Sequence, residues 1–285
     1  GLDQGEFNVL TGDSGTFAER VCADGRVRAL SFTGSTEVGR RLLEQSAATV
    51  KCTAMELGGN APFVVCDDVD LDTAVEGAIA AKFQTSGQDC LAANRILVQR
   101  SVHDEFVERF ARRVDALRVG NGFEEGTEIG PLIHESAVRK AEEIVADAEA
   151  QGARIRGRGQ AQAPGSHFFV PTVIEGVTPA MRAFREEAFA PLAPILAFDD
   201  DDEAIAAAND TPYGLAAYVY TGDERRMRHY LRKLDFGMVG LNTMDLTGPH
   251  VPFGGMKQSG LGREGGVVGM EEYLETQYFC IGGRG

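Results

Sequence analysis

The sequence predicts an α/β fold with largely parallel sheets. Short apolar runs of strand length alternate with longer segments in which apolar residues recur at helical spacing. Glycines and capping residues separate the two kinds of segment. Strands that alternate with helices in this way are typical of parallel sheets with helices packed on their faces. The 285 residues are enough to form about two domains.

Three strand-to-helix units are predicted in the N-terminal third of the chain. We expect a strand at 7–10 before a helix at 14–24, and a strand at 27–32 before a second helix. A continuous apolar run at 61–65 is typical of a central strand, and Asp70 is the expected N-cap of the helix after it.

The second of these junctions has the form of a phosphate-binding turn. Gly34 and Ser35 join a strand to a helix N-terminus, where free amides and the positive end of the helix dipole attract an anion. An ordinary Ser N-cap gives the same pattern. From the residues alone we favour the ordinary cap, because single short motifs often arise by chance.

The alternation of strands and helices continues to residue 241. We expect strands at 95–99, 153–156, 168–174, 215–220 and 238–241. The expected helices are one opened by a Ser101 and Asp104 capping box, one at 135–151 and one at 223–234. Residues 157–166 are expected to form a surface loop. Residues 199–203 are all acidic and lead into another helix. Acids at a helix start are explained by the helix dipole, so we assign no metal.

Composition excludes several classes of protein. The net charge of −15 disfavours a nucleic-acid partner, because binding to phosphates depends on Lys and Arg. No apolar run approaches the ~20 residues of a membrane span. The five cysteines lack CxxC or His-rich spacing and predict neither a disulfide framework nor a zinc site. We therefore expect no nucleic acid, no membrane and a reducing cytoplasm.

Two glycine-containing stretches, 56–60 and 86–90, each carry one reactive side chain. Glu56 opens the first and Cys90 closes the second. A thiol and a carboxylate are the groups that an enzyme needs to form and then hydrolyse a thioester. Taken singly, however, a lone Cys is more often a small buried hydrophobe and a lone Glu a surface charge.

Five motifs give these two residues a context. FTGSTEVG lies at 32–39, MELGGN at 55–60, GQDC at 87–90, EEAFAP at 186–191 and PFGGMKQSG at 252–260. With these motifs in this order, the chain from residue 7 to residue 282 resembles the NAD(P)-dependent aldehyde dehydrogenases, and among them the succinate-semialdehyde dehydrogenase branch.

The resemblance implies three parts. Residues 1–58 would be a remnant of a Rossmann-type cofactor domain, 59–248 the α/β catalytic domain, and 249–285 a segment that returns to the cofactor domain and ends in an oligomerisation strand. It also implies that an N-terminal part is absent here, with its Asn of the oxyanion hole and its cofactor-binding Lys. The full-length enzyme would be a homo-oligomer, either a dimer or a tetramer.

The resemblance also implies roles for particular residues. Cys90 would attack a small aldehyde, and Glu56 would take a proton from the water that hydrolyses the thioester. NAD or NADP would contact Gly34 and Ser35 at its phosphates, Leu57 at its carboxamide, and Glu187 and Phe189 at its nicotinamide ribose. Without the motif, Glu187 would be read as a surface acid in a charged run.

Substrate recognition departs from the branch pattern. Gln84 stands where Arg usually binds the substrate carboxylate, although Thr247 can still supply a hydroxyl there. Asp89 stands where Thr is usual and would raise the pKa of Cys90 by repulsion. We expect succinate semialdehyde or a similar semialdehyde as substrate. The alternatives are an aldehyde dehydrogenase of broad specificity and an inactive fragment or structural relative.

Overall fold

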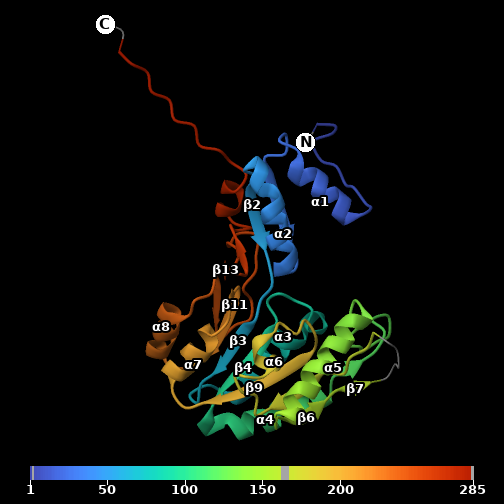
Figure 1. The fold of residues 1–285 in the computed structure, drawn as a ribbon. Helices are drawn as coiled ribbons and strands as arrows, with labels where there is room; N and C mark the ends of the chain where they lie inside the picture. Colours follow the sequence, from blue (N-terminus) through green and yellow to red (C-terminus); the bar gives the residue numbers. More distant parts are fainter. Residues whose placement is uncertain (2, 162–166, 284–285) are drawn as a thin grey trace.

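A computed structural model describes residues 1, 3–161 and 167–283. The elements form a small body, which contains the N-terminal helices, and a larger body built on a seven-stranded sheet (Figure 1). The residues that carry the five motifs lie mainly where these two bodies meet.

The small body is a three-stranded sheet covered by two helices. Its elements are α1 (Ser14–Ala23), β1 (Ala29–Thr33), α2 (Thr36–Ser46), η1 (Ala47–Thr49), β2 (Cys52–Glu56) and β14 (Gly260–Leu261). β1 and β2 are parallel, and β14 from the C-terminal segment is antiparallel to β2. Cys22, Leu42, Met55 and Leu57 form its buried core.

Two sequence predictions fail in this body. The strand expected at 7–10 is absent, and the side chains of Phe7, Val9 and Leu10 are about three-quarters exposed. An apolar run forms a strand only when another strand pairs with it, and none does so among the described residues. Conversely, β2 was not predicted, because its sequence CTAME has no clear apolar alternation. Glu56 therefore ends a strand instead of lying in a loop.

The larger body is a seven-stranded sheet in the order β12-β11-β3-β4-β9-β8-β6. Neighbouring strands are parallel except β6 and β8, which are antiparallel. The strands are β3 (Ala61–Val65), β4 (Ala93–Gln99), β6 (Arg154–Arg158), β8 (Thr172–Glu175), β9 (Leu192–Phe198), β11 (Ala216–Tyr220) and β12 (Met238–Leu241). The predicted parallel α/β class is confirmed.

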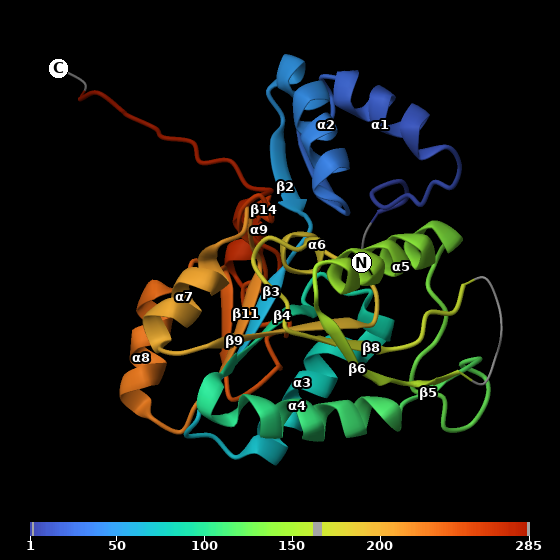
Figure 2. The same ribbon diagram turned by 60° about the horizontal axis from the view of Figure 1, so that its bottom comes forward.

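Helices cover both faces of this sheet (Figure 2). α3 (Leu71–Phe83) and α4 (Arg100–Asp115) pack on one face, and α5 (Glu135–Ala150), α6 (Arg182–Arg185), α7 (Asp201–Asn209) and α8 (Glu224–Lys233) on the other. The alternation of side chains along β3 shows the two faces. Phe63 and Val65 join the core under α3 and α4, whereas Val64 and Cys66 join the core on the opposite face.

Caps and ion pairs explain several junctions. As predicted, Asp70 caps α3 by accepting a hydrogen bond from the Thr73 amide at 2.8 Å. The expected Ser101 capping box is wrong, because Gln99 is the N-cap and α4 begins at Arg100. In the acidic run, Asp200 caps α7, and its neighbours pair with Arg100, Arg226, His229 and Lys233.

Short elements complete the structure. They are η2 (Gln84–Gly87), β5 (Arg118–Val119), β7 (Gln160–Ala161), β10 (Tyr213–Gly214), β13 (Met256–Lys257) and α9 (Val268–Glu271). β5 pairs with β7, and β10 with β13. The loop predicted at 157–166 therefore begins with strand residues, and residues 162–166 lie outside the described part.

Just after α9, Glu275 still pairs with Arg28 of the small body at 3.0 Å, and the chain beyond it runs away from both bodies (Figure 1). Its described residues form no strand, and the side chains of Tyr278, Phe279 and Ile281 are 85%, 74% and 95% exposed. The oligomerisation strand expected here thus has no partner within the described residues. None of the described helices is both long enough and apolar enough to cross a bilayer.

Candidate active site

Cys90 follows a strained turn that its neighbours hold in place. Thr85, Ser86 and Gly87 of η2 have consecutive positive φ angles of 53°, 57° and 69°. Non-glycine residues rarely adopt such angles unless the surroundings hold them. Ser86 Oγ accepts a hydrogen bond from the Gly130 amide at 2.9 Å, and a side chain at position 87 would collide with the backbone that precedes β9. The loop is thereby fixed before it reaches Cys90.

Glu56 is buried at the end of β2. Its side chain is 4% exposed, and its Oε2 atom has no hydrogen-bond partner among the described residues. Burial raises the pKa of Glu56 to about 8, with repulsion from Glu264 adding to the rise and Arg263 opposing it. A Cβ at Gly254 would lie 3.0 Å from Glu56 Oε1. Glycine at 254 therefore leaves room for the carboxyl group.

The turn after Glu56 brings the two predicted reactive residues into one region. A side chain at Gly59 would collide with the Cys90 carbonyl, so the two backbones are in direct contact. The Gly59 amide also donates a hydrogen bond to Glu187 Oε1 at 2.8 Å. Burial, together with repulsion from Asp89, Glu187 and Glu56, raises the pKa of the Cys90 thiol to about 12. Cys90 therefore lies among acids.

Ser259, to which the sequence analysis gave no role, fixes this turn from the C-terminal segment. It is fully buried, and its Oγ donates to the Gly58 carbonyl at 2.7 Å and accepts from the Gly214 amide at 2.9 Å. Its own carbonyl accepts from the Leu57 amide at 2.8 Å. Ser259 lies in the motif at 252–260, and this motif was the feature of the sequence that could have pointed to it. These contacts join three segments that are distant in the sequence.

The predicted phosphate-binding residues lie at the start of α2. Ser35 is the N-cap and accepts from the Val38 amide at 3.4 Å, while the Gly34 amide donates to the Glu56 carbonyl at 3.0 Å. Both Gly34 and Ser35 are exposed. Leu57 is buried, and its side chain packs where a Cβ at Gly39 would be. The helix start is therefore accessible and adjoins the Glu56 strand.

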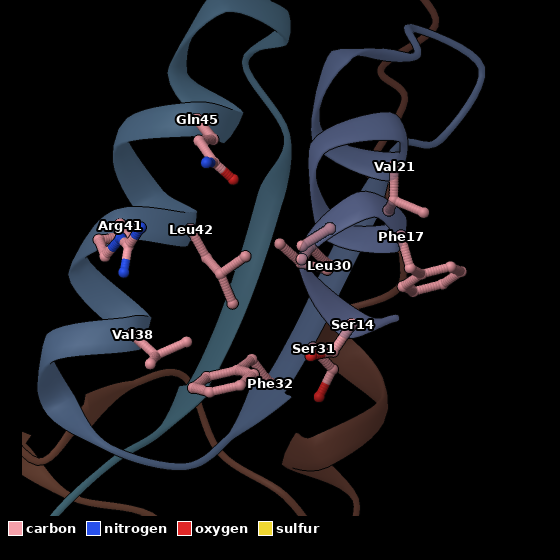
Figure 3. Close-up of a pocket in the computed structure, with 12 residues that line it drawn as sticks. Ser14, Phe17, Val21, Leu30, Ser31, Phe32, Val38, Arg41, Leu42 and Gln45 are labelled. Atoms are coloured by element: carbon pink, nitrogen blue, oxygen red, sulfur yellow. The ribbon is translucent and has the colours of Figure 1, made fainter. Parts of the chain in front are cut away.

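An apolar pocket of about 400 Å³ lies beside this helix start, between α1, α2 and β1 (Figure 3). Val38 and Leu42 of α2 face Leu30 and Phe32 of β1, and Phe17 and Val21 of α1 close the other side. The apolar residues of α2 recur at helical spacing and form a stripe along the helix. The exposed fraction of Val38, 40%, shows that part of this stripe faces the open pocket.

Glu187 and Phe189 follow α6 and have different surroundings. Glu186 pairs with Arg182, whereas Glu187 turns inward to Gly59 and is half-buried, so it is not the plain surface acid of the alternative interpretation. Burial raises the pKa of Glu187, opposed by the Gly59 amide and nearby lysines. Phe189 has a φ of 51° and is 39% exposed. Strained backbone of this kind clusters at active sites and ligand-binding sites.

A second cavity, of about 170 Å³, lies on the α3 side of Cys90. Gln84 and Thr247, the predicted substrate residues, both line it. So do Asp89 and Leu91, the two chain neighbours of Cys90. Asp245 completes the polar lining and had not been singled out. The structure thus brings the two predicted residues together in one cavity beside Cys90.

One group of described side chains has the spacing of metal ligands, His103, Asp104 and Glu175. Glu175 already pairs with Arg156 at 2.9 Å and with Arg154 at 3.6 Å. The Asp104 side chain is almost fully exposed. We assign no metal to this group.

The fold and the site define an α/β protein with a thiol, a buried carboxyl group and a helix start close together. The sequence profile of the aldehyde dehydrogenase family matches residues 1–279, and the chain belongs to this family. Members of the family use NAD(P)+ and are oxidoreductases.

Individual relatives are similar over nearly the whole chain. The non-phosphorylating aspartate-semialdehyde dehydrogenase of Halomonas elongata is 59% identical over 285 residues, which are 100% of this chain and 58% of that protein. The NADP+ succinate-semialdehyde dehydrogenase GabD of Escherichia coli is 49% identical over 99% of this chain and 58% of its own length. A crystal structure of an NADP-dependent E. coli enzyme superposes with a TM-score of 0.94 at 49% identity, covering 97% of this chain and 57% of that one. The chain spans about 58% of the length of these curated relatives.

Proposed function

We propose that this chain carries the reactive thiol and the general base of an aldehyde dehydrogenase that oxidises a small semialdehyde to its carboxylate with NAD+ or NADP+. One observation carries the proposal. The turn after Glu56 contacts the Cys90 backbone, while the buried Glu56 carboxyl keeps one oxygen without a partner among the described residues. A buried, unsatisfied carboxyl group beside a thiol suits proton transfer from water near that thiol.

The chemistry uses the two residues in turn. The Cys90 thiol loses its proton to solvent, the thiolate forms a C–S bond to the aldehyde carbon, and the carbonyl oxygen becomes an oxyanion beside the Cys90 amide. The dinucleotide, when bound, supplies the acceptor for the hydride that leaves this carbon. The Cys90 thioester remains. Glu56 takes a proton from water, the resulting hydroxide attacks the thioester, and the Cys90 thiolate leaves as the carboxylate product forms.

The residues of the small body fit a dinucleotide. The exposed Ser35 end of α2 offers amides and a positive dipole end to a phosphate, and the apolar pocket beside it suits a flat base. Glu187 can accept hydrogen bonds from ribose hydroxyls, and Phe189 offers an exposed ring beside it. We keep NAD+ and NADP+ as alternatives.

The proposed substrate is a semialdehyde, because relatives named for aspartate and succinate semialdehyde match almost the whole chain. A broad-specificity enzyme is the alternative that Gln84 favours, since a neutral amide binds a carboxylate less strongly than Arg does. The deciding assay measures NADH and NADPH formation from succinate semialdehyde and from butanal, an uncharged aldehyde of equal length. The complete gene product that carries this sequence is used. Absence of turnover with both aldehydes and both dinucleotides would refute the proposed function.

Arginine at position 84 is expected to strengthen carboxylate recognition. Gln84 is exposed at the cavity beside Cys90, and a guanidinium group there can make two charge-assisted hydrogen bonds, whose worth of roughly 1.5 to 3 kcal/mol each is reduced by contact with water. The Gln84→Arg variant should raise kcat/KM for succinate semialdehyde relative to butanal by at least about tenfold. Gln84→Met, which removes the amide but adds no charge, is the control. An unchanged ratio in Gln84→Arg would show that position 84 does not face the substrate tail.

We also propose that the chain associates with further copies through its C-terminal segment and that it works in the cytoplasm. The exposed Tyr278, Phe279 and Ile281 support the first proposal, and the five free thiols support the second. The 285-residue chain alone should associate in solution and show no turnover. Removing residues 273–285 should reduce its mass by light scattering, whereas Gln277→Ala should not. A monomeric, active 285-residue chain would contradict this expectation.

A further inference from the structure

The cavity beside Cys90 has the position of a substrate-tail site. It lies between the end of α3, the loop that carries Cys90, and the segment at 244–247. Both chain neighbours of Cys90 line it, although Cys90 itself does not, so the cavity lies close enough to the thiol to take the tail of an aldehyde bound there. Its volume of about 170 Å³ suits a tail of a few atoms.

The charges around this cavity do not suit a tail that carries only a carboxylate. Two lining side chains, Asp89 and Asp245, are acids, and no Lys, Arg or His lines the cavity in the described part of the chain. Asp89 uses Oδ1 to accept from the Leu91 amide at 2.8 Å, which leaves Oδ2 for a ligand. Asp245 has no ion-pair partner among the residues that the structure describes. Two carboxylates without a counter-charge repel an anion and attract a cation.

The other polar groups complete the pattern. The Gln84 amide and the Thr247 hydroxyl can donate hydrogen bonds to a carboxylate. The Tyr218 hydroxyl donates to the Leu91 carbonyl at 2.9 Å and is therefore already engaged. The cavity thus offers negatively charged hydrogen-bond acceptors, the two aspartates, and uncharged donors, the Gln84 amide and the Thr247 hydroxyl. An ammonium group beside a carboxylate, as at the end of an α-amino acid, complements both.

We propose that Asp245 and Asp89 select aldehydes whose tail is an α-ammonium carboxylate, in which the acids bind the ammonium and Gln84 and Thr247 bind the carboxylate. This inference rests on the proposed function, since it concerns the tail of the aldehyde that Cys90 would attack. Under this inference the preferred substrate is the semialdehyde of an amino acid and not one, such as succinate semialdehyde, whose tail carries only a carboxylate. Asp245 and Asp89 thereby become determinants of specificity.

A matched pair of aldehydes tests the inference. Aspartate semialdehyde and succinate semialdehyde have the same four-carbon skeleton and differ by one ammonium group. In the complete gene product, kcat/KM should be at least about tenfold higher for aspartate semialdehyde, given the strength of charge-assisted hydrogen bonds. Asp245→Asn should lower this ratio by about tenfold, and Asp89→Asn should lower it as well. Asp245→Glu, which keeps the charge, should retain most of the preference.

The ratio of the two substrates removes effects on Cys90 itself, because Asp89→Asn should also lower the pKa of the Cys90 thiol and change all rates together. Asp202→Asn, at an exposed acid on α7, is the matched control and should leave the ratio unchanged. A ratio that stays the same in both Asp245→Asn and Asp89→Asn, while butanal is still oxidised, overturns the inference and leaves the proposed function intact.

Binding gives a second readout that needs no turnover. L-2-Aminobutyrate and butyrate are unreactive analogues that differ by the same ammonium group. Calorimetry should show tighter binding of L-2-aminobutyrate, and Asp245→Asn should remove the difference. Equal binding of the two compounds to the unmodified protein would overturn the inference. A difference that depends on Asp245, in a protein that oxidises none of the aldehydes, would support the inference and refute the proposed catalysis.

Discussion

Replacing Cys90 with serine should abolish aldehyde oxidation while binding of the dinucleotide persists. A serine hydroxyl without an adjacent strong base is a far weaker nucleophile than a thiolate, and loss of a covalent nucleophile typically costs orders of magnitude in rate. We expect kcat/KM to fall by at least about 100-fold. The measurements are steady-state NAD(P)H formation and calorimetric binding of the dinucleotide in the complete gene product.

The control for this variant is Cys280→Ser, which changes an exposed thiol in the C-terminal segment. It should retain full turnover. Activity of Cys90→Ser above about one per cent of the unmodified protein would show that another group forms the covalent bond. A parallel loss of dinucleotide binding would show instead that the substitution disturbs the fold around the η2 turn.

Replacing Glu56 with glutamine should leave the first half of the reaction and stop the second. Hydride transfer needs the Cys90 adduct only, whereas hydrolysis of the thioester needs a base for water. Stopped-flow absorbance should therefore show a burst of NAD(P)H of about one equivalent per site, followed by little turnover. Absence of the burst would contradict the role of Glu56 as the hydrolytic base.

The raised pKa of Glu56 determines how steady-state turnover should change with pH. A general base must be deprotonated, and with a pKa of about 8 Glu56 is mostly protonated at neutral pH. Steady turnover should rise with pH and level off above about 8, where deacylation limits the rate. Glu264→Gln, which removes the acid whose charge adds to this pKa, should move the midpoint to lower pH and keep turnover. An unchanged midpoint would show that another group titrates.

The sequence was most informative where a local pattern decides the structure. The apolar run at 61–65 is typical of a buried strand, and Asp70 had the position of an N-cap, and both were predicted correctly. The run at 7–10 looks similar but forms no strand, because a strand also needs a partner that the local sequence does not show. For the same reason β2 was missed, since pairing with β1 and β14 decides its conformation.

The candidate site shows the same division. Motifs identified Glu56, Cys90 and Glu187 one at a time, but the contact of Gly59 with Cys90 could not be seen from spacing. Ser259 bonds to Gly58 across 201 positions, and Asp245 joins Gln84 in a cavity through folding alone. Such long-range contacts depend on the assembled sheets, which no local pattern describes.

The turn at 57–60 has a mechanical consequence. It is the only stretch of chain between β2 of the small sheet and β3 of the large sheet, and Glu56 stands at one end of it while the Cys90 backbone touches the other. Because Glu56 belongs to the small body, a rotation of that body about residues 57–60 would change the distance between Glu56 and Cys90. The hydrogen bonds that join Ser259 to Leu57 and Gly58 oppose that rotation, because they attach the turn to the C-terminal segment as well. The relative orientation of the two bodies therefore determines how far Glu56 lies from Cys90, and with it the geometry of the proposed thioester hydrolysis.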